Sequence, residues 1–198
     1  MPSPPKTNEA KIVAAARKLV EKHGRNGFSM NDVARAVGVR APSLYGRFAD
    51  RAALLASVEL ELWRALERAL GAVPKVADAA RTLTAQAHAY RAFAKAHPQG
   101  YALIFDAEAE RTEEGLSART AAVAQTAPSF AKLVGERDAL AAARVLTPFL
   151  HGFVSMELAG AFRLGAGLDE AFERGVATIL FGLKRAGWSK RRARSRQS

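Results

Sequence analysis

Residues 29–51, SMNDVARAVGVRAPSLYGRFADR, constrain the fold of this chain more than any other stretch. Ser29 suits a helix N-cap, and the apolar residues around Val33 then fall on one face of the helix that follows. Gly38 supplies a turn residue that tolerates a positive φ. A second helix begins near Pro42, where the missing N–H costs nothing. A helix, a glycine-containing turn and a helix form a helix-turn-helix, whose second helix enters the DNA major groove.

The second helix of this motif is expected to carry most of the side chains that meet DNA. Arg40 lies at its start, where a guanidinium pairs well with guanine O6 and N7. Leu44, Tyr45 and Phe48 mark its inner side, with the Tyr45 hydroxyl reaching a phosphate. Two phosphate anchors are expected at the N-terminal ends of the first motif helix and of the helix after the motif. The predicted DNA-binding residues are Ser29, Arg40, Ala41, Pro42, Ser43, Tyr45, Arg47 and Arg51.

A longer set of residues around the motif has the spacing of a known signature: Ala16, Gly24, Val33, Ala34, Ala36, Gly38, Val39, Ser43, Leu44, Tyr45, Phe48, Arg51, Ala53, Leu54 and Leu55. This set resembles the DNA-binding signature of the tetracycline-repressor (TetR) family of bacterial transcription regulators. The family more often has Lys in place of Arg51 and a larger residue in place of Gly46. The resemblance implies an all-α chain, with an N-terminal three-helix head joined by a long helix to an α-helical ligand-binding and dimerisation body.

The net charge of +11 is confined to the two ends of the chain. Residues 1–51 carry ten Lys or Arg against four Asp or Glu, residues 188–198 carry five against none, and residues 52–187 are neutral. The charge at the head points to a polyanionic partner, attracted through counterion release. Nonspecific DNA contact and simple disorder both stay open for the tail. The predicted domains are residues 1–51 (helix-turn-helix), 52–187 (effector binding and dimerisation) and 188–198 (basic tail).

Composition and motif content exclude several other classes of protein. The chain has no cysteine, which excludes disulfides and thiolate metal sites and fits a reducing cytoplasm. The N-terminal residues, MPSPPKTNEAK, are polar and Pro-rich with no apolar run, so we do not expect them to form a signal peptide. No run approaches the ~18 uncharged apolar residues of a membrane span. There is no Gly-rich phosphate loop, no metal-ligand spacing and no nucleophile–base pair. We therefore expect a cytoplasmic protein that is not an enzyme and has no cofactor.

The apolar periodicity predicts helices along the whole chain and no strand-like alternation. Residues 1–7 are expected to be disordered, residues 106–114 to form an exposed acidic turn, and His23 to face inward. The residues around Pro128 interrupt one helix, and Pro148 is a possible kink in another. The expected helices are 8–23, the two motif helices, 50–70, 78–96, a short one after Pro98, 116–134, 136–164 and 168–185.

The last two predicted helices have apolar residues on more than one face, and such helices must be buried by something. The resemblance implies that these helices pair with those of a second copy in a four-helix interface. A symmetric dimer also fits palindromic DNA half-sites about 34–36 Å apart. The alternative is that the extra apolar faces only pack on the body.

The second half resembles one C-terminal subtype of the family through Tyr90-x-x-Phe93-Ala94, His97-Pro98 and His151-Gly152-Phe153. Leu150 stands where that subtype has the Trp of a Trp-His-Gly motif. The family binds small molecules in this region, and the effector here is expected to be hydrophobic. The residues predicted to line the effector site are Tyr90, Phe93, Tyr101, Phe105, His151 and Ser155. Aromatic residues at helical spacing can also simply belong to the hydrophobic core.

Two functions from different classes follow from these features. The first is a ligand-responsive dimeric repressor, which binds a palindromic double-stranded DNA operator and is released by a small molecule. The second is a nucleoid-type structural protein that coats DNA without sequence preference. A coating protein has no need of the neutral, aromatic-containing body of residues 52–187, so this body favours the regulator.

Overall fold

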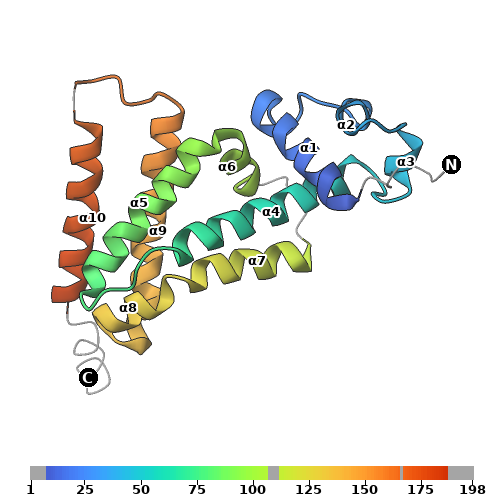
Figure 1. The fold of residues 1–198 in the computed structure, drawn as a ribbon. Coiled ribbons are helices and arrows are strands. Elements are labelled where there is room, and N and C mark those ends of the chain that lie inside the picture. Colours follow the sequence, from blue (N-terminus) through green and yellow to red (C-terminus); the bar gives the residue numbers. More distant parts are fainter. Residues whose placement is uncertain (1–7, 107–111, 166, 187–198) are drawn as a thin grey trace, which may run out of the picture. The chain divides into compact units, whose positions relative to one another are not determined.

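The computed structural model describes residues 8–106, 112–165 and 167–186 (Figure 1). Within these ranges the chain forms ten helices and no strand, which confirms the predicted all-α class. The predictions for residues 1–7 and for the basic tail lie outside the described residues, as does most of the acidic turn. The chain divides into two compact units, residues 1–65 with 96–120 and residues 66–95 with 121–198.

The first unit contains the predicted helix-turn-helix. Helix α1 (Glu9–His23) is capped by Asn8, whose side-chain oxygen accepts a hydrogen bond from the Lys11 N–H at 3.0 Å. Helices α2 (Met30–Val37) and α3 (Pro42–Tyr45) flank Gly38, which has φ 72° and ψ 30° and therefore ends α2 in the left-handed region that glycine favours. Helix α4 (Arg51–Gly71) starts in this unit. The core of the unit includes Ile12, Ala16, Val20, Val33, Leu44, Leu54, Val58 and Leu62.

One packing prediction for α1 is wrong, because His23 is exposed. It lies in the last turn of the helix, where the chain has already reached the Gly24 C-cap. Leu62 and the other apolar side chains of α4 fill the core instead. A polar imidazole at this end of the helix stays hydrated when it is exposed, so the position gains nothing from burial.

Helix α6 (Pro98–Ile104) belongs to the same compact unit as the helix-turn-helix. The first turn of α6 has no side-chain cap of its own. The Glu21 carboxylate on α1 accepts hydrogen bonds from the N–H groups of Gln99 at 3.3 Å and Gly100 at 3.2 Å. A Cβ added to Gly100 would lie 2.7 Å from Leu62 Cδ2 and closer still to Glu21 Oε1, so any other residue here would require both side chains to move.

The second unit contains α5 (Ala79–Ala96), α8 (Ala127–Val134), α9 (Glu136–Leu158) and α10 (Leu168–Arg185), while α7 (Glu113–Ala124) begins in the first unit. The break between α7 and α8 confirms the interruption predicted near Pro128. Pro148 lies inside α9 without ending it. Helix α9 ends six residues before the predicted Leu164, because the chain turns at Gly160, which has φ 63°.

Aromatic rings join α9 and α10 within the second unit. Phe172 is fully buried, and its ring centroid lies 6.3 Å from that of Phe149 and 5.2 Å from that of Phe153. Gly175 permits this packing, since a Cβ there would lie 2.8 Å from Phe149 Cε2 and closer still to Cζ of the same ring. The apolar face of α10 that the sequence predicts is therefore largely used inside the chain, while part of the α9 surface is left over.

Candidate nucleic-acid interface

The first helix of the motif begins with a reciprocal cap. Ser29 Oγ accepts a hydrogen bond from the Asp32 N–H at 3.3 Å, and the Asp32 carboxylate accepts from the Ser29 N–H at 2.8 Å. The Ser29 hydroxyl also donates to Asp32 Oδ2 at 2.7 Å. The hydrogen bonds from the Ser29 side chain and then its backbone lower the pKa of Asp32. The hydroxyl thus serves the cap, and its predicted phosphate contact stays a prediction.

Helix α3 is fixed by two buried side chains and presents the rest of its surface to solvent. Leu44 and Phe48 are buried, and their i, i+4 spacing puts them on one face. Backbone hydrogen bonds continue the helical turn past Tyr45, with the N–H groups of Arg47 and Phe48 both donating to the Leu44 carbonyl at 2.9 Å. The exposed set consists of Arg40, Pro42, Ser43, Tyr45, Gly46 and Arg47, with Ala41 half-buried.

The prediction that the Tyr45 ring lies in the core is wrong, because Tyr45 is 54% exposed. The physical reason lies in the helix period. Leu44 and Phe48 define the inward direction, and the residue after Leu44 is rotated by about 100° from it. Both the ring and the hydroxyl of Tyr45 therefore lie on the solvent side with Arg47.

Arg51, expected to anchor a phosphate, makes contacts inside the first unit that the sequence did not predict, and its phosphate contact stays a prediction. Its Nε donates a hydrogen bond to the Phe28 carbonyl at 3.1 Å, and its Nη2 donates to the Arg25 carbonyl. The guanidinium carbon lies 4.7 Å from the centre of the Phe28 ring. Burial, and next the nearby Arg25, lower the pKa of Arg51, although a guanidinium stays charged in proteins. Arg51 therefore ties the α1–α2 loop to the start of α4.

We expect Arg51→Lys to destabilise the protein although it keeps the charge. An ammonium cannot reproduce the two forked hydrogen bonds together with the contact of the guanidinium with the Phe28 ring. The expected loss is about 1–3 kcal/mol of unfolding free energy, measured by urea denaturation. The matched control is Arg47→Lys, because Arg47 is exposed in the turn after α3. If the two variants are equally stable, the prediction is wrong and Arg51 acts only as a surface charge.

Four of the predicted effector residues lie on two helices of the second unit. Tyr90 and Phe93 are buried on α5 at i, i+3 spacing. His151 and Ser155 are half-buried on α9 at i, i+4 spacing, and burial lowers the pKa of His151. Each pair thus shares one face of its helix, which is the arrangement needed for lining residues.

The other two predicted effector residues belong to the first unit. Tyr101 is buried on α6, and its ring centroid lies 4.9 Å from that of Phe105 just after the helix. The Phe105 ring also makes an edge contact with Trp63 on α4, at 5.6 Å between centroids. These contacts give Tyr101 and Phe105 a packing role, and their role as effector ligands stays a prediction.

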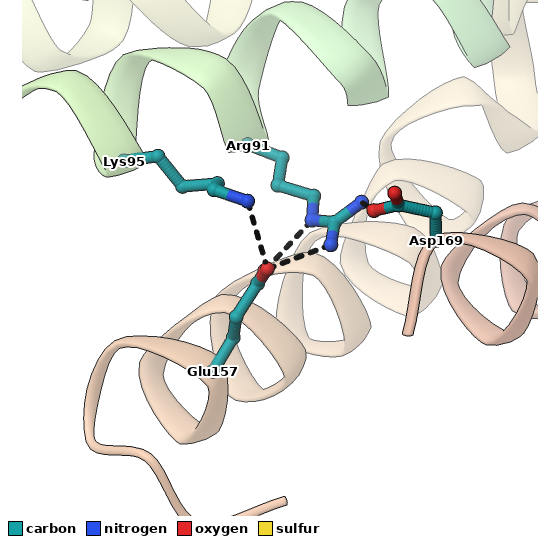
Figure 2. Close-up of polar contacts among 4 residues, drawn as sticks. All are labelled: Arg91, Lys95, Glu157 and Asp169. Atoms are coloured by element: carbon teal, nitrogen blue, oxygen red, sulfur yellow. Dashed lines mark hydrogen bonds and ion pairs between the residues drawn. The ribbon is translucent and has the colours of Figure 1, made fainter. Parts of the chain in front are cut away.

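A charged cluster that was not predicted from the sequence lies in the second unit (Figure 2). Arg91 on α5 forms two hydrogen bonds of 2.7 Å with Glu157 at the end of α9, and a 2.7 Å ion pair with Asp169 at the start of α10. Lys95 donates to Glu157 at 3.1 Å. The side chains of Arg91 and Glu157 are only 8% and 11% exposed.

A signal for this cluster existed in the sequence. Arg91 directly follows Tyr90 and lies two residues before Phe93, so it sits among apolar residues of a predicted buried helix. A buried arginine needs a carboxylate partner. The Arg91 guanidinium carbon also lies 4.8 Å from the centre of the Phe172 ring, so the cation rests on the aromatic core.

Comparison with known proteins relates both halves of the chain to one family. Residues 12–58 match the family described as "Bacterial regulatory proteins, tetR family". Residues 83–179 match "Tetracyclin repressor-like, C-terminal domain". The HTH-type transcriptional regulator YobS of Bacillus subtilis (strain 168) is 28% identical over 175 residues, which cover 87% of this chain and 90% of YobS.

Two solved structures show the same fold at lower identity. A single-substitution variant of TetR from Acinetobacter baumannii AYE, in complex with minocycline, has a TM-score of 0.68 at 23% identity and covers 91% of this chain and 98% of its own. BioQ with its natural double-stranded DNA operator has a TM-score of 0.63 at 22% identity, with 90% and 98% covered. The exposed α3 surface and these matches lead to one conclusion: the chain belongs to the tetracycline-repressor (TetR) family of bacterial transcription regulators.

Proposed function

We propose that this regulator is a dimeric repressor, which binds a palindromic operator and is released by a hydrophobic small molecule in the cytoplasm. The observation that carries the DNA-binding part is the α3 surface, where Leu44 and Phe48 are buried and Arg40, Ser43 and Arg47 are exposed. Two similar structures support the proposed DNA and small-molecule partners, since BioQ was solved with an operator and the A. baumannii protein with minocycline. The family match does not favour a nonspecific coating protein.

Selection from randomised DNA with the full chain tests the function. A dimeric helix-turn-helix regulator is expected to enrich an inverted repeat whose half-sites lie about 10 bp apart, one helical turn. The same selection in the presence of a hydrophobic compound that raises the melting temperature should recover less DNA. A protein that enriches no sequence at any salt concentration would be a coating protein instead.

The proposed dimer rests on an exposed apolar stripe along α9. Val145 and Met156 are 44% and 48% exposed, and Phe149 between them is half-buried. A Cβ added to Gly152 would meet nothing within 4 Å, so another helix could approach the backbone there. These residues follow i, i+4, i+7 and i+11 spacing and share one face. A neighbouring face of α9, which includes Leu146 and Leu150, is buried within the unit.

The same stripe explains the hydropathy of α9. Within the described ranges, α9 is the one helix that is long and apolar enough by composition to cross a membrane. Its apolar residues divide between the core of the second unit and the stripe, and Arg144 lies between Ala142 and Leu146. A helix with one face in its own core and one in a subunit interface needs this composition.

We expect Val145→Glu to convert the dimer into a monomer that stays folded. The side chain is exposed in the single chain, so the carboxylate is penalised only where a second copy covers it. Light scattering measures the mass, and circular dichroism checks the helix content. The matched control is Val123→Glu on α7, at a residue 46% exposed. If the unmodified protein is already a monomer, the dimer proposal fails.

The basic tail, residues 188–198, is proposed to add affinity for DNA without adding sequence preference. Its five Lys or Arg residues and no acidic ones allow phosphate contacts. Deleting residues 189–198 is expected to make log K less steep against log salt while the ranking of operators stays the same. A changed base preference after deletion would place the tail in a groove of the DNA instead.

A further inference from the structure

An open groove lies between α5 and α10 in the second unit, with a volume of about 560 Å³. Ala80 and Ala85 on α5 and Ala177 on α10 keep it hollow, because their side chains are small. Phe181 forms one wall and is 61% exposed, which is unusual for a phenylalanine in a single compact unit. The volume lies within the range of small-molecule sites in proteins.

The rim of this groove carries positive charge without compensation. Arg81 and Lys184 line it from the two helices, and no Asp or Glu is among its lining residues. In the described part of the chain, neither of these two side chains is paired with a carboxylate. Arg185 adds a third cation, with its guanidinium carbon 5.2 Å from the centre of the Phe181 ring. The groove is thus apolar inside and cationic at its edge.

The charge of the rim decides which occupant fits. Residues 188–198 come soon after α10 in the sequence but carry five Lys or Arg and no Asp or Glu, so they do not offer the negative group that suits this rim. A second copy placed symmetrically over the groove would add the same rim cations to the interface, and the groove lining offers no carboxylate to balance them. An occupant with an apolar body and a negative group satisfies both the walls and the rim. We propose that this groove binds a small amphipathic carboxylate, with its chain along Phe181 and its carboxylate between Arg81 and Lys184.

The chemistry of such binding follows from the two parts of the ligand. An apolar chain removes the exposed Phe181 ring from water. Charge-assisted hydrogen bonds from a guanidinium and an ammonium then hold the carboxylate, and the low polarity of the groove strengthens them. The groove does not include the residues predicted for the effector wall. Its occupancy is therefore a second binding function, which does not depend on the operator.

Calorimetric titration of the full chain with decanoate tests the proposal, with decan-1-ol as the uncharged probe of equal chain length. Decanoate is expected to bind at least about tenfold more tightly than the alcohol, as expected for carboxylate recognition by two cations. Arg81→Glu/Lys184→Glu should remove that advantage. Ala177→Phe should weaken both probes by about fivefold or more, because it fills the groove and leaves every charge in place. Lys132→Glu, on α8 outside the groove, is the control.

The results separate this proposal from the proposed regulatory function, because none of these residues lies in the helix-turn-helix. Operator affinity of the charge-reversed variant should stay close to that of the unmodified protein. Absence of decanoate binding overturns the proposal, as does equal binding of decanoate and decan-1-ol. Binding that survives both the charge reversal and Ala177→Phe places the ligand elsewhere and overturns it too. If the charge-reversed variant changes its oligomeric state, the groove is an interface with a second copy, and the proposal is overturned.

Discussion

Replacing Arg91 with alanine is expected to lower the free energy of unfolding by about 3–5 kcal/mol, the cost of leaving a buried carboxylate without its partner. Glu157 is 11% exposed and accepts two 2.7 Å hydrogen bonds from Arg91. Lys95 also contacts Glu157 but is itself exposed and cannot replace a buried guanidinium. Urea denaturation followed by circular dichroism measures the loss.

Two further variants separate the charge pair from its packing. Arg91→Met/Glu157→Met removes both charges and is expected to recover most of the lost stability, because no buried charge is left unpaired. The matched control is Arg174→Ala, which breaks the ion pair with Glu170 on the surface of α10. That loss should stay under about 1 kcal/mol. A comparable loss from the exposed and the buried pair would contradict the assignment.

The pH dependence of the buried pair has a definite sign. The hydrogen bond from Arg91 lowers the pKa of Glu157 in the folded protein. A carboxyl group whose pKa is lowered by folding contributes stability above its unfolded pKa, and this stability is lost as the pH falls through the folded pKa. The stability difference between the unmodified protein and Glu157→Gln should therefore be full near neutral pH and shrink on acidification.

The second large effect is expected at the DNA surface, from Arg40→Ala. Arg40 is exposed just before α3, where its guanidinium can reach a guanine edge. The expected cost is about 1–3 kcal/mol per half-site, with relaxed preference at one base pair in each. A dimer on a palindrome carries this cost in both half-sites. Selection from randomised DNA, followed by affinity measurements at fixed salt, reports both the cost and the position.

Arg47→Ala is the companion variant, because Arg47 is exposed on the same short segment. We expect it to weaken binding to all sequences about equally. The salt slope should fall by roughly one unit for each phosphate that is no longer neutralised. Arg51 is unsuitable for this comparison, since its side chain is bound to backbone carbonyls inside the unit. Equal and uniform losses for Arg40 and Arg47 would place both on the DNA backbone.

The helices and the motif could be predicted from the sequence because their signals are local. Caps such as Asn8 and Ser29, the turn at Gly38 and the apolar spacing act within one or two helical turns. Tyr45 was misplaced because it is an aromatic residue next to Leu44, which is buried. Leu44 and Phe48 alone define the inner face, and the helix period was sufficient to place Tyr45 outside.

The cluster around Arg91 could not be predicted in the same way. Arg91 and Glu157 are 66 residues apart, and their pairing depends on how α5 meets the end of α9. The contacts of Arg51 could not be predicted for a related reason, because its partners are backbone carbonyls before α2 that carry no sequence signal. Spacing along one helix predicts which face is buried, but it does not identify the partner on another helix.

The hydrogen bonds from α6 to Glu21 have a consequence for protein engineering. A simple way to build a hybrid regulator is to cut the chain soon after the helix-turn-helix and fuse the fragment to a foreign body. Here such a cut, even at residue 65, would strip Glu21 of the Gln99 and Gly100 N–H groups and remove Tyr101 and Ile104 from the unit that holds α1. A hybrid that keeps the helix-turn-helix unit intact must therefore include residues 96–120 as well, supplied as a second and separate segment of chain.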